Sequence, residues 1–320
     1  MFKSSLIAAI GAAVALAAFA APPPASAQES AAAQAVRMQQ ERERRESRQS
    51  GDRPTRENRN SRNAPAAPTP EENIAAAQGI IATTTVSCQV TQANLLGETA
   101  EGAKTYEAAC ATGPGYIVIG TTPAQAIDCV LLAGQAELDR ARDPAAVAGT
   151  QCVIPQNADV LRVLTAYATE AGVPCAVDQG ASIGKSGENL IYEVGCNGVD
   201  GYWLEREPTG WKKTECAIVI TQNATCRYST VAEQSATFKA RLVGSEAEPC
   251  DVTQGLYMGA NANGSFWEAK CAAGNGVIVR FNPEFAVQQV YPCETAQRIG
   301  GGCTLTVVPA APEATPPATE

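Results

Sequence analysis

The apolar and polar positions of the chain follow one arrangement three times. Alternating apolar and polar residues lead into the phrases TYEAAC, IYEVGC and FWEAKC, which end at Cys110, Cys196 and Cys271. A link of four residues follows each phrase, and a second apolar run then begins, as GYIVIG, GYWLER or GVIVRF. Two extended runs around a short glycine-bearing loop predict a β-hairpin. The pattern therefore predicts three equivalent hairpins.

Each hairpin belongs to a longer repeat. The repeats open as CQVTQANLLG at 88–97, CAVDQGASIG at 175–184 and CDVTQGLYMG at 250–259, sharing the pattern C-x-V-[TD]-Q-[AG]-x-x-x-G. A second Cys follows 21 or 22 residues later, always with Glu three residues before it and Gly five residues after it. Matched offsets of this kind indicate an internally triplicated protein.

The repeat predicts short strands with connecting loops. We expect the opening C-x-V-x to be a short strand that ends in a glycine-bearing loop. A fourth short strand is expected to carry the third Cys, as in IDCVLL and ECAIVI. The Gly after the second Cys predicts a position where a side chain is disfavoured.

Helices are predicted to join the repeats. In 155–172, the residues Val160, Val163, Leu164, Tyr167 and Ala168 share one helical face. The next helix shows a capping box, Thr230 with Glu233, and a stop at Gly244. The first repeat carries an extra stretch, GQAELDRARDPAAVAG, which predicts an inserted helix and loop.

The predicted fold class is α+β and β-rich, with three tandem disulfide-stapled modules of short antiparallel strands and linking helices after a disordered N-terminal arm. The predicted boundaries are a signal peptide at 1–27, an Arg-rich arm at 28–75, modules at 83–172, 173–247 and 248–307, and a Pro-rich tail at 308–320.

Twelve cysteines fall into four per repeat. An even number in an exported protein predicts a disulfide framework. Proximity favours pairing the first with the second and the third with the fourth, and spacing leaves first with fourth open as the alternative. The chain has no histidine and no C-x-x-C, so neither a metal nor another cofactor is expected. The cysteines are Cys88, Cys110, Cys129, Cys152, Cys175, Cys196, Cys216, Cys226, Cys250, Cys271, Cys293 and Cys303.

The two ends of the chain differ in charge from its body. A basic start, an apolar stretch and Ala25-Ser26-Ala27 predict a secretory signal peptide, with no transmembrane segment after its cleavage. Residues 37–62 hold nine Arg against five acidic residues, whereas residues 63–320 hold fourteen Lys or Arg against twenty-seven acidic residues. An acidic body is not expected to bind nucleic acid. We therefore expect a periplasmic or secreted protein of the bacterial cell envelope.

Candidate functional residues divide into repeated and unrepeated ones. The absence of histidine excludes Ser-His and Cys-His nucleophiles. The repeated Glu107, Glu193 and Glu268 are interpreted as structural, and the repeated Gln92, Gln179 and Gln254 as buried partners of loop amides. The densest aromatic and charged stretch, GYWLEREPTGW, is typical of a contact surface. Its candidate binding residues are Tyr202, Trp203, Arg206, Trp211 and Lys212.

The leading functional hypothesis is a non-enzymatic protein that binds a protein or an envelope polymer through its modules. The alternatives are an inhibitor or protective protein acting on a hydrolase, and a hydrolase that uses carboxylates.

Overall fold

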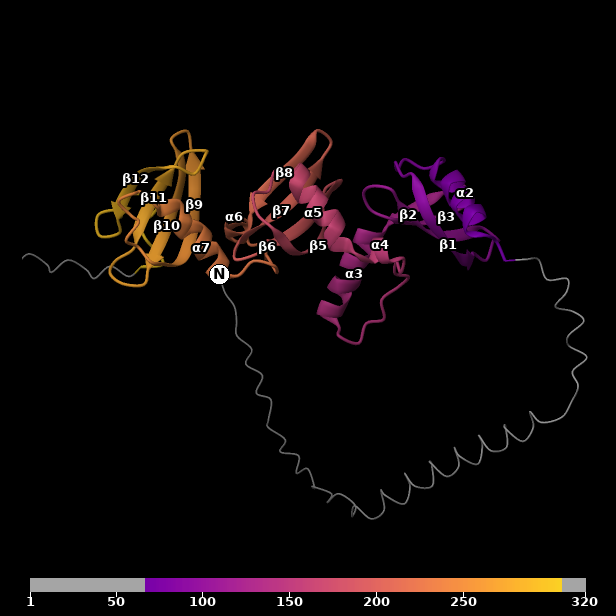
Figure 1. The fold of residues 1–320 in the computed structure, drawn as a ribbon. Coiled ribbons are helices and arrows are strands. Elements are labelled where there is room, and N and C mark those ends of the chain that lie inside the picture. Colours follow the sequence, from indigo (N-terminus) through magenta and orange to yellow (C-terminus); the bar gives the residue numbers. More distant parts are fainter. Residues whose placement is uncertain (1–66, 307–320) are drawn as a thin grey trace, which may run out of the picture. The chain divides into compact units, whose positions relative to one another are not determined.

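Each predicted hairpin lies at the centre of a four-stranded antiparallel sheet (Figure 1). The structure is a computed structural model that describes residues 67–306. The predicted signal peptide, most of the arm and the tail lie outside the described residues. The hairpins are β2–β3, β6–β7 and β10–β11, and the outer strands of the sheets are β1 and β4, β5 and β8, β9 and β12.

The twelve strands and the helices confirm the α+β fold class. Module 1 contains α2 (Pro70–Ile81), β1 (Val90–Glu98), β2 (Lys104–Cys110), β3 (Tyr116–Ile119), β4 (Gln125–Asp128) and α3 (Cys129–Arg142). Module 2 contains α4 (Pro155–Ala158), α5 (Val160–Glu170), β5 (Val177–Ser186), β6 (Asn189–Cys196), β7 (Val199–Glu207), β8 (Gly210–Glu215), α6 (Cys216–Val219) and η2 (Ile220–Gln222). Module 3 contains α7 (Val231–Leu242), β9 (Val252–Asn261), β10 (Gly264–Cys271), β11 (Val277–Phe281) and β12 (Val287–Pro292).

The first strand of each module is longer than predicted. The expected glycine loop is instead a β-bulge inside one continuous strand, because the register shifts beside the repeated glycine in β1, β5 and β9. Gly97, Gly184 and Gly259 have φ values of 147°, 136° and 131°, which L-residues with side chains rarely adopt. The glycine repeats because the bulge requires that backbone conformation.

The predicted helix signals are confirmed. Thr230 and Glu233 form a reciprocal capping box at the start of α7, and Gly244 follows its end with a φ of 78°. Val163, Leu164 and Ala168 are buried on one face of α5. The predicted helix at 155–172 is broken into α4 and α5 at Asp159, whose side chain caps the second helix.

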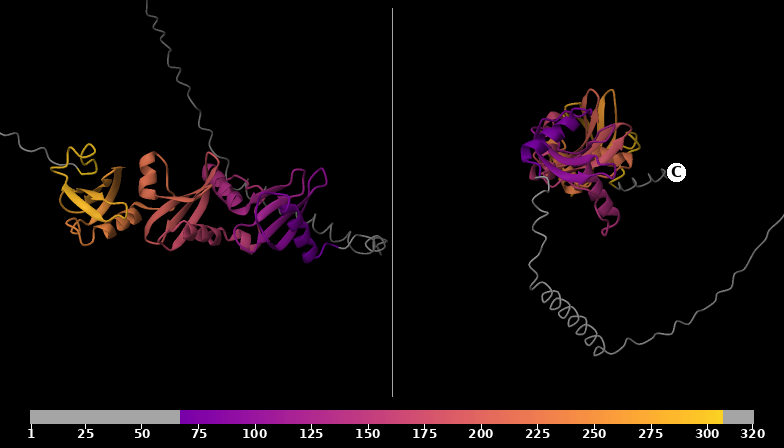
Figure 2. Two further views of the ribbon diagram at one scale, coloured as in Figure 1. Left: turned by 90° about the horizontal axis from the view of Figure 1, so that it is seen from above. Right: turned by 90° about the vertical axis from the view of Figure 1, so that its right-hand side faces the viewer.

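The helices belong to the sheets that follow them. Apolar residues of α2, α5 and α7 form one core each with the next sheet along the chain, and Figure 1 and Figure 2 show each helix lying against its sheet. A Cβ added at Gly255 would stand 2.5 Å from Phe238 of α7, and one at Gly180 would stand 2.7 Å from the carbonyl oxygen of Glu193 and 3.0 Å from Leu164 of α5. The predicted arm thus overlaps α2 from Pro70 onward, and the helix that we assigned to module 1 packs on module 2.

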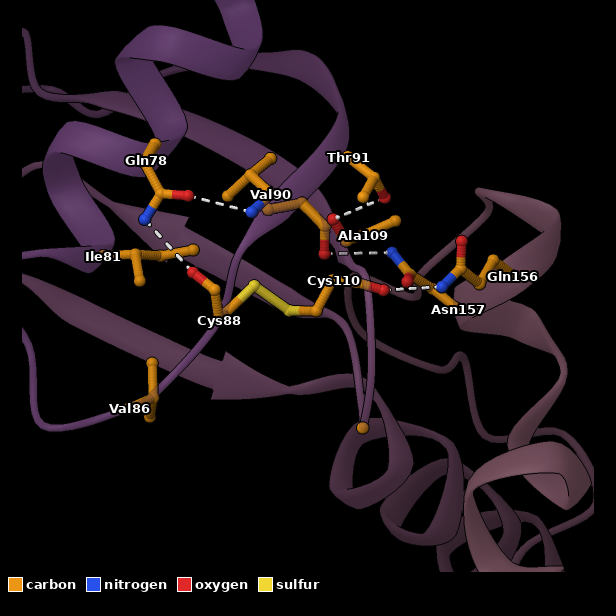
Figure 3. The surroundings of a disulfide bond; sticks show 12 residues. Gln78, Ile81, Val86, Cys88, Val90, Thr91, Ala109, Cys110, Gln156 and Asn157 are labelled. Carbon is orange, nitrogen blue, oxygen red and sulfur yellow. Dashed lines mark hydrogen bonds between the residues drawn. A yellow bond between two sulfur atoms is a disulfide. The ribbon is translucent and has the colours of Figure 1, made fainter. Parts of the chain in front are cut away.

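Six disulfides link the first Cys to the second and the third to the fourth in every module. This confirms the favoured pairing and excludes first with fourth. The third Cys does not lie within the fourth strand as predicted, because the strand ends one residue earlier in each module. Figure 3 shows the first disulfide, Cys88–Cys110, beside Gln78 of α2, whose side chain bonds to the backbone of Cys88 and Val90.

The segment after the third Cys also contacts the next module. In α3, the predicted inserted helix, Val130 is buried in the core of module 2. An added Cβ at Gly134 would stand 2.3 Å from the carbonyl oxygen of Ser182 in β5. Ala217 of α6 is likewise part of the core of module 3. The third Cys therefore begins a segment that joins consecutive modules at both junctions.

Candidate functional site

The repeated glutamates lie on the face of each sheet opposite its helix. Glu107, Glu193 and Glu268 are all 0% exposed. The carboxylate of Glu107 accepts hydrogen bonds from the backbone N–H groups of Val153 and Ile154, at 2.9 and 2.8 Å, and from the side-chain amide of Asn157. Each glutamate thus holds the segment that follows the fourth Cys against the central strand.

The same bonding recurs in the other two modules. Glu193 accepts from the N–H groups of Arg227 and Tyr228. Glu268 accepts from three consecutive N–H groups, those of residues 304–306. These segments have no regular secondary structure, so without the carboxylate their buried amides would lack partners. The geometry supports the structural interpretation of the repeated Glu.

A disulfide stands beside each of these carboxylates. A carboxylate oxygen of Glu107 and the sulfurs of Cys129 and Cys152 all lie within 4.8 Å of one another, and the same holds around Glu193 and Glu268. These three atoms could bind a metal only if both cysteines were thiolates. The two sulfurs are bonded to each other, so no thiolate is present. Burial raises the pKa of Glu193, opposed by the N–H groups of Tyr228 and Arg227.

The repeated glutamines differ from expectation. Gln92, Gln179 and Gln254 are exposed, and none of their side chains makes a hydrogen bond within residues 67–306. They stand on the first strand of each sheet, which is a sheet edge, so the loop amides that we expected them to satisfy are absent. The interpretation as buried loop partners is wrong, because the loop is a strand with a bulge.

The structure divides the predicted contact residues of module 2 between the two faces of its sheet. Tyr202, Arg206 and Trp211 lie on the face covered by α5, whereas Trp203 and Lys212 lie on the face of Glu193. Tyr202 is only 7% exposed and belongs to the core. Strand alternation requires this separation, since residues 202 and 203 point to opposite faces.

Arg206 and Trp211 form a cluster at the rim of α5. The guanidinium of Arg206 lies 4.6 Å from the centre of the Trp211 ring. Both side chains bond to the carboxylate of Glu170, at 3.3 Å from Arg206 and 3.0 Å from the indole nitrogen. Trp211 also packs on Tyr167 and Tyr192. About half of the Arg206 and Glu170 side chains is exposed and Trp211 is half-buried, so this cluster presents an ion pair beside an aromatic ring.

Trp203 and Lys212 lie on the other face. Trp203 stands directly opposite Glu193 in the register of β6 and β7, and its indole nitrogen is buried. Lys212 forms an ion pair with Glu205 at 3.1 Å. The pKa of Glu205 is lowered, first by its hydrogen bond from Asn189 and then by Lys212.

A cleft of about 570 Å³ opens on the Glu107 face of module 1. Its floor consists of strand residues, among them Ile117, Ile119 and Ile127, and Leu96 stands beside them. Leu96 is 42% exposed and Ile127 is 36% exposed. The facing wall comes from α3 and from residues 149–151, which lie between the third and fourth cysteines, and the inserted stretch of the first repeat, 134–149, supplies most of α3. The cleft is therefore made by the segment that distinguishes repeat one.

Module 3 has a cleft of about 460 Å³ at the equivalent place. Met258 stands eight residues after the first Cys, as Leu96 does, and Tyr291 stands two before the third Cys, as Ile127 does. Arg298 and Ile299, from between the third and fourth cysteines, form its wall. The floor here is aromatic, with Phe266 and Tyr291, so the two clefts share a position but differ in lining.

The position two residues after the repeated Gly lies on the face of the repeated Glu in all three modules, and in module 1 it lines the cleft. It holds Ile117 in module 1 and Ile278 in module 3, and Trp203 in module 2. All three stand opposite the repeated Glu. Sequence analysis selected Trp203 but missed the clefts, although the alternating Ile117 and Ile119 and the insertion in repeat one were visible signals.

Within residues 67–306 no helix is long and apolar enough to cross a bilayer. The six disulfides are consistent with an extracellular protein, because such bonds persist in oxidising compartments. Searches among protein-family models, curated proteins and solved structures found no match for this chain.

Proposed function

We propose that this is an exported, non-enzymatic binding protein of the bacterial cell envelope, periplasmic or secreted, which holds a partner through clefts on its modules. The observation that carries the proposal is the pair of clefts at equivalent positions in modules 1 and 3. Both lie on the face of the repeated Glu, between the end of the first strand of the module and the segment between the third and fourth cysteines.

The repeat supports a distinction between constant structural residues and variable contact residues within each module. The glutamate and the disulfides hold the scaffold, because the carboxylate is buried and bonded to backbone amides. The residues around each cleft differ between modules, as Ile127, Thr214 and Tyr291 illustrate at one equivalent position. Binding proteins commonly combine a constant rigid scaffold with variable contact residues.

The proposal disfavours a hydrolase built on the repeated carboxylates. A general acid must reach the substrate atom that it protonates. Glu107, Glu193 and Glu268 have no exposed surface, and at least one oxygen of each accepts hydrogen bonds from backbone amides, while the second oxygen of Glu107 and of Glu193 is also buried. The second contact surface in the proposal is the exposed cluster of Arg206 and Trp211, where a stacked cation and an aromatic edge are typical of binding hot spots.

Site-specific photo-crosslinking in the producing cells tests this function. A photoreactive amino acid replaces Leu96, Met258 or Arg206 in the full chain, and Val231, which is exposed on α7, serves as the control position. We expect a discrete adduct from Leu96 or Met258 that the Val231 variant does not form, with the partner identified by mass spectrometry. Identical adducts from all positions, or none at either cleft, would contradict a cleft-based binding function.

A further inference from the structure

The cleft of module 1 has one charge sign among its lining residues. Glu98, at the end of β1, and Asp139, on α3, are the charged side chains that line it. Neither forms an ion pair within residues 67–306, and one oxygen of Asp139 accepts a hydrogen bond from Gln135. Glu98 stands opposite Lys104 in the register of β1 and β2, so Asp139 is the carboxylate that favours a cationic group on whatever fills the cleft.

The floor of the module 1 cleft is aliphatic. Ile117, Ile119, Ile127 and Leu132 line it, and none of the lining side chains is aromatic. Sugar polymers are commonly held by stacking on aromatic rings, which this cleft lacks. An aliphatic side chain matches the floor, because burying it removes apolar surface of both partners from water.

Polar groups around the rim suit a polypeptide backbone. Hydroxyl groups of Thr99, Thr105 and Thr150 and the side-chain amides of Gln135 and Gln151 line the cleft. Hydroxyl and amide groups can donate to carbonyl oxygens and accept from N–H groups, which an extended chain presents in alternation.

We infer that the module 1 cleft binds an extended polypeptide segment in which an aliphatic side chain stands beside a lysine or arginine. This inference rests on the proposed function and names the ligand class of one of its two clefts. The aliphatic group lies on Ile119 and Ile127, and the cation lies beside Asp139.

Fluorescence anisotropy with two labelled hexapeptides tests the inference on the full mature chain. One peptide alternates Lys with Leu, and the other alternates Glu with Leu. The apolar variant is Leu96→Gln with Ile127→Thr, the latter being the residue that module 2 carries at this position. The acidic variant is Asp139→Asn. Its charge-matched control is Glu188→Gln, an exposed carboxylate in another module.

We expect the Lys–Leu peptide alone to bind, and its affinity to fall about tenfold in the apolar and acidic variants but not in the control. Circular dichroism verifies that each variant is folded. Equal binding of both peptides, or an equal loss in the control, overturns the inference, because attraction to the acidic body as a whole would then account for binding. No peptide binding together with a persisting Leu96 crosslink refutes this ligand class and leaves the proposed function standing.

Discussion

Glu193 and Trp203 stand directly opposite each other on β6 and β7, one repeated in every module and the other unique to the second. The partners of the repeated Glu elsewhere are Ile117 and Ile278. Glu193 holds the backbone of its module together by accepting from the N–H groups of Arg227 and Tyr228. Trp203 lies beside it on the same sheet face, which is the face that carries the clefts in modules 1 and 3. Scaffold residues and variable contact residues are therefore adjacent.

The role of Glu107 as a hydrogen-bond acceptor can be separated from its negative charge by mutation. Glu107→Ala leaves the buried N–H of Ile154, the part-buried N–H of Val153 and the side-chain amide of Asn157 without their acceptor, which is expected to lower the free energy of unfolding by on the order of 4 kcal/mol. Glu107→Gln keeps an acceptor oxygen and should cost only about 1 kcal/mol. Urea denaturation measures both, and Glu101→Ala, on an exposed turn, is the control. Equal losses in the Ala and Gln variants would show that charge, not acceptor geometry, matters.

The buried carboxylate is also expected to protect its neighbouring disulfide from reduction. A thiolate attacking Cys293–Cys303, and the thiolate released there, would both stand near the negative charge of Glu268. Glu268→Gln should therefore speed reduction of this bond by dithiothreitol several-fold relative to Cys250–Cys271 in the same protein. Alkylation and mass mapping over time give both rates. Glu294→Gln, which removes an exposed carboxylate next to Cys293, should leave the ratio unchanged.

Asp200, which is buried, and Asp128, which is half-buried, predict that stability falls as pH rises. Burial raises the pKa of Asp128 and of Asp200 to about 6. Since these values exceed the usual value of about 4 for an unfolded chain, the stabilisation is complete below pH 4 and is lost as pH rises through 6. Between pH 5 and pH 7.5 each group should lower the free energy of unfolding by about 1 kcal/mol.

Asp200→Asn tests the assignment of this pH dependence. The Asn side chain retains an acceptor oxygen, although one of the two bonds that Asp200 accepts, from Ser229 and from the N–H of Ala217, must change. Urea denaturation from pH 5 to pH 7.5 should show a smaller slope in the variant than in the wild type. A slope that is unchanged, or stability that rises with pH in the wild type, would contradict the raised pKa.

The repeated Gly after the second Cys is required for space, not for its φ angle. A Cβ at Gly201 would lie 2.5 Å from the carbonyl oxygen of Val194, and one at Gly276 would lie 2.4 Å from that of Ala269. Gly201→Ala should lower the free energy of unfolding by about 2 kcal/mol, since the hairpin cannot open without weakening its ladder. Gly149→Ala, where nothing lies within 4 Å, is the control, and thermal unfolding of both variants checks the difference.

Much of the scaffold could be predicted because its signals are local or repeated. The hairpins, the capping box at Thr230 and the cysteine pairing each depend on spacings of a few to about twenty residues, and the structure confirms them. The glycine bulge was misread as a loop, since glycine marks both and only strand pairing distinguishes them. The predicted boundaries at 172 and 247 leave α5 and α7 with the preceding module, although each packs on the sheet that follows it, because a helix between two sheets carries no local sign of which sheet it covers.

The sequence by itself determined three stapled, β-rich modules, because triplicated offsets of Cys, Glu and Gly report the same local geometry three times. The tertiary structure alone decided where the clefts lie. Leu96, Ile127 and residues 149–151 are distant in the chain and meet only when α3 and its loop fold over the Glu107 face. Such a surface depends on the packing of the inserted segment against a sheet formed elsewhere, and periodicity along the chain does not encode that contact.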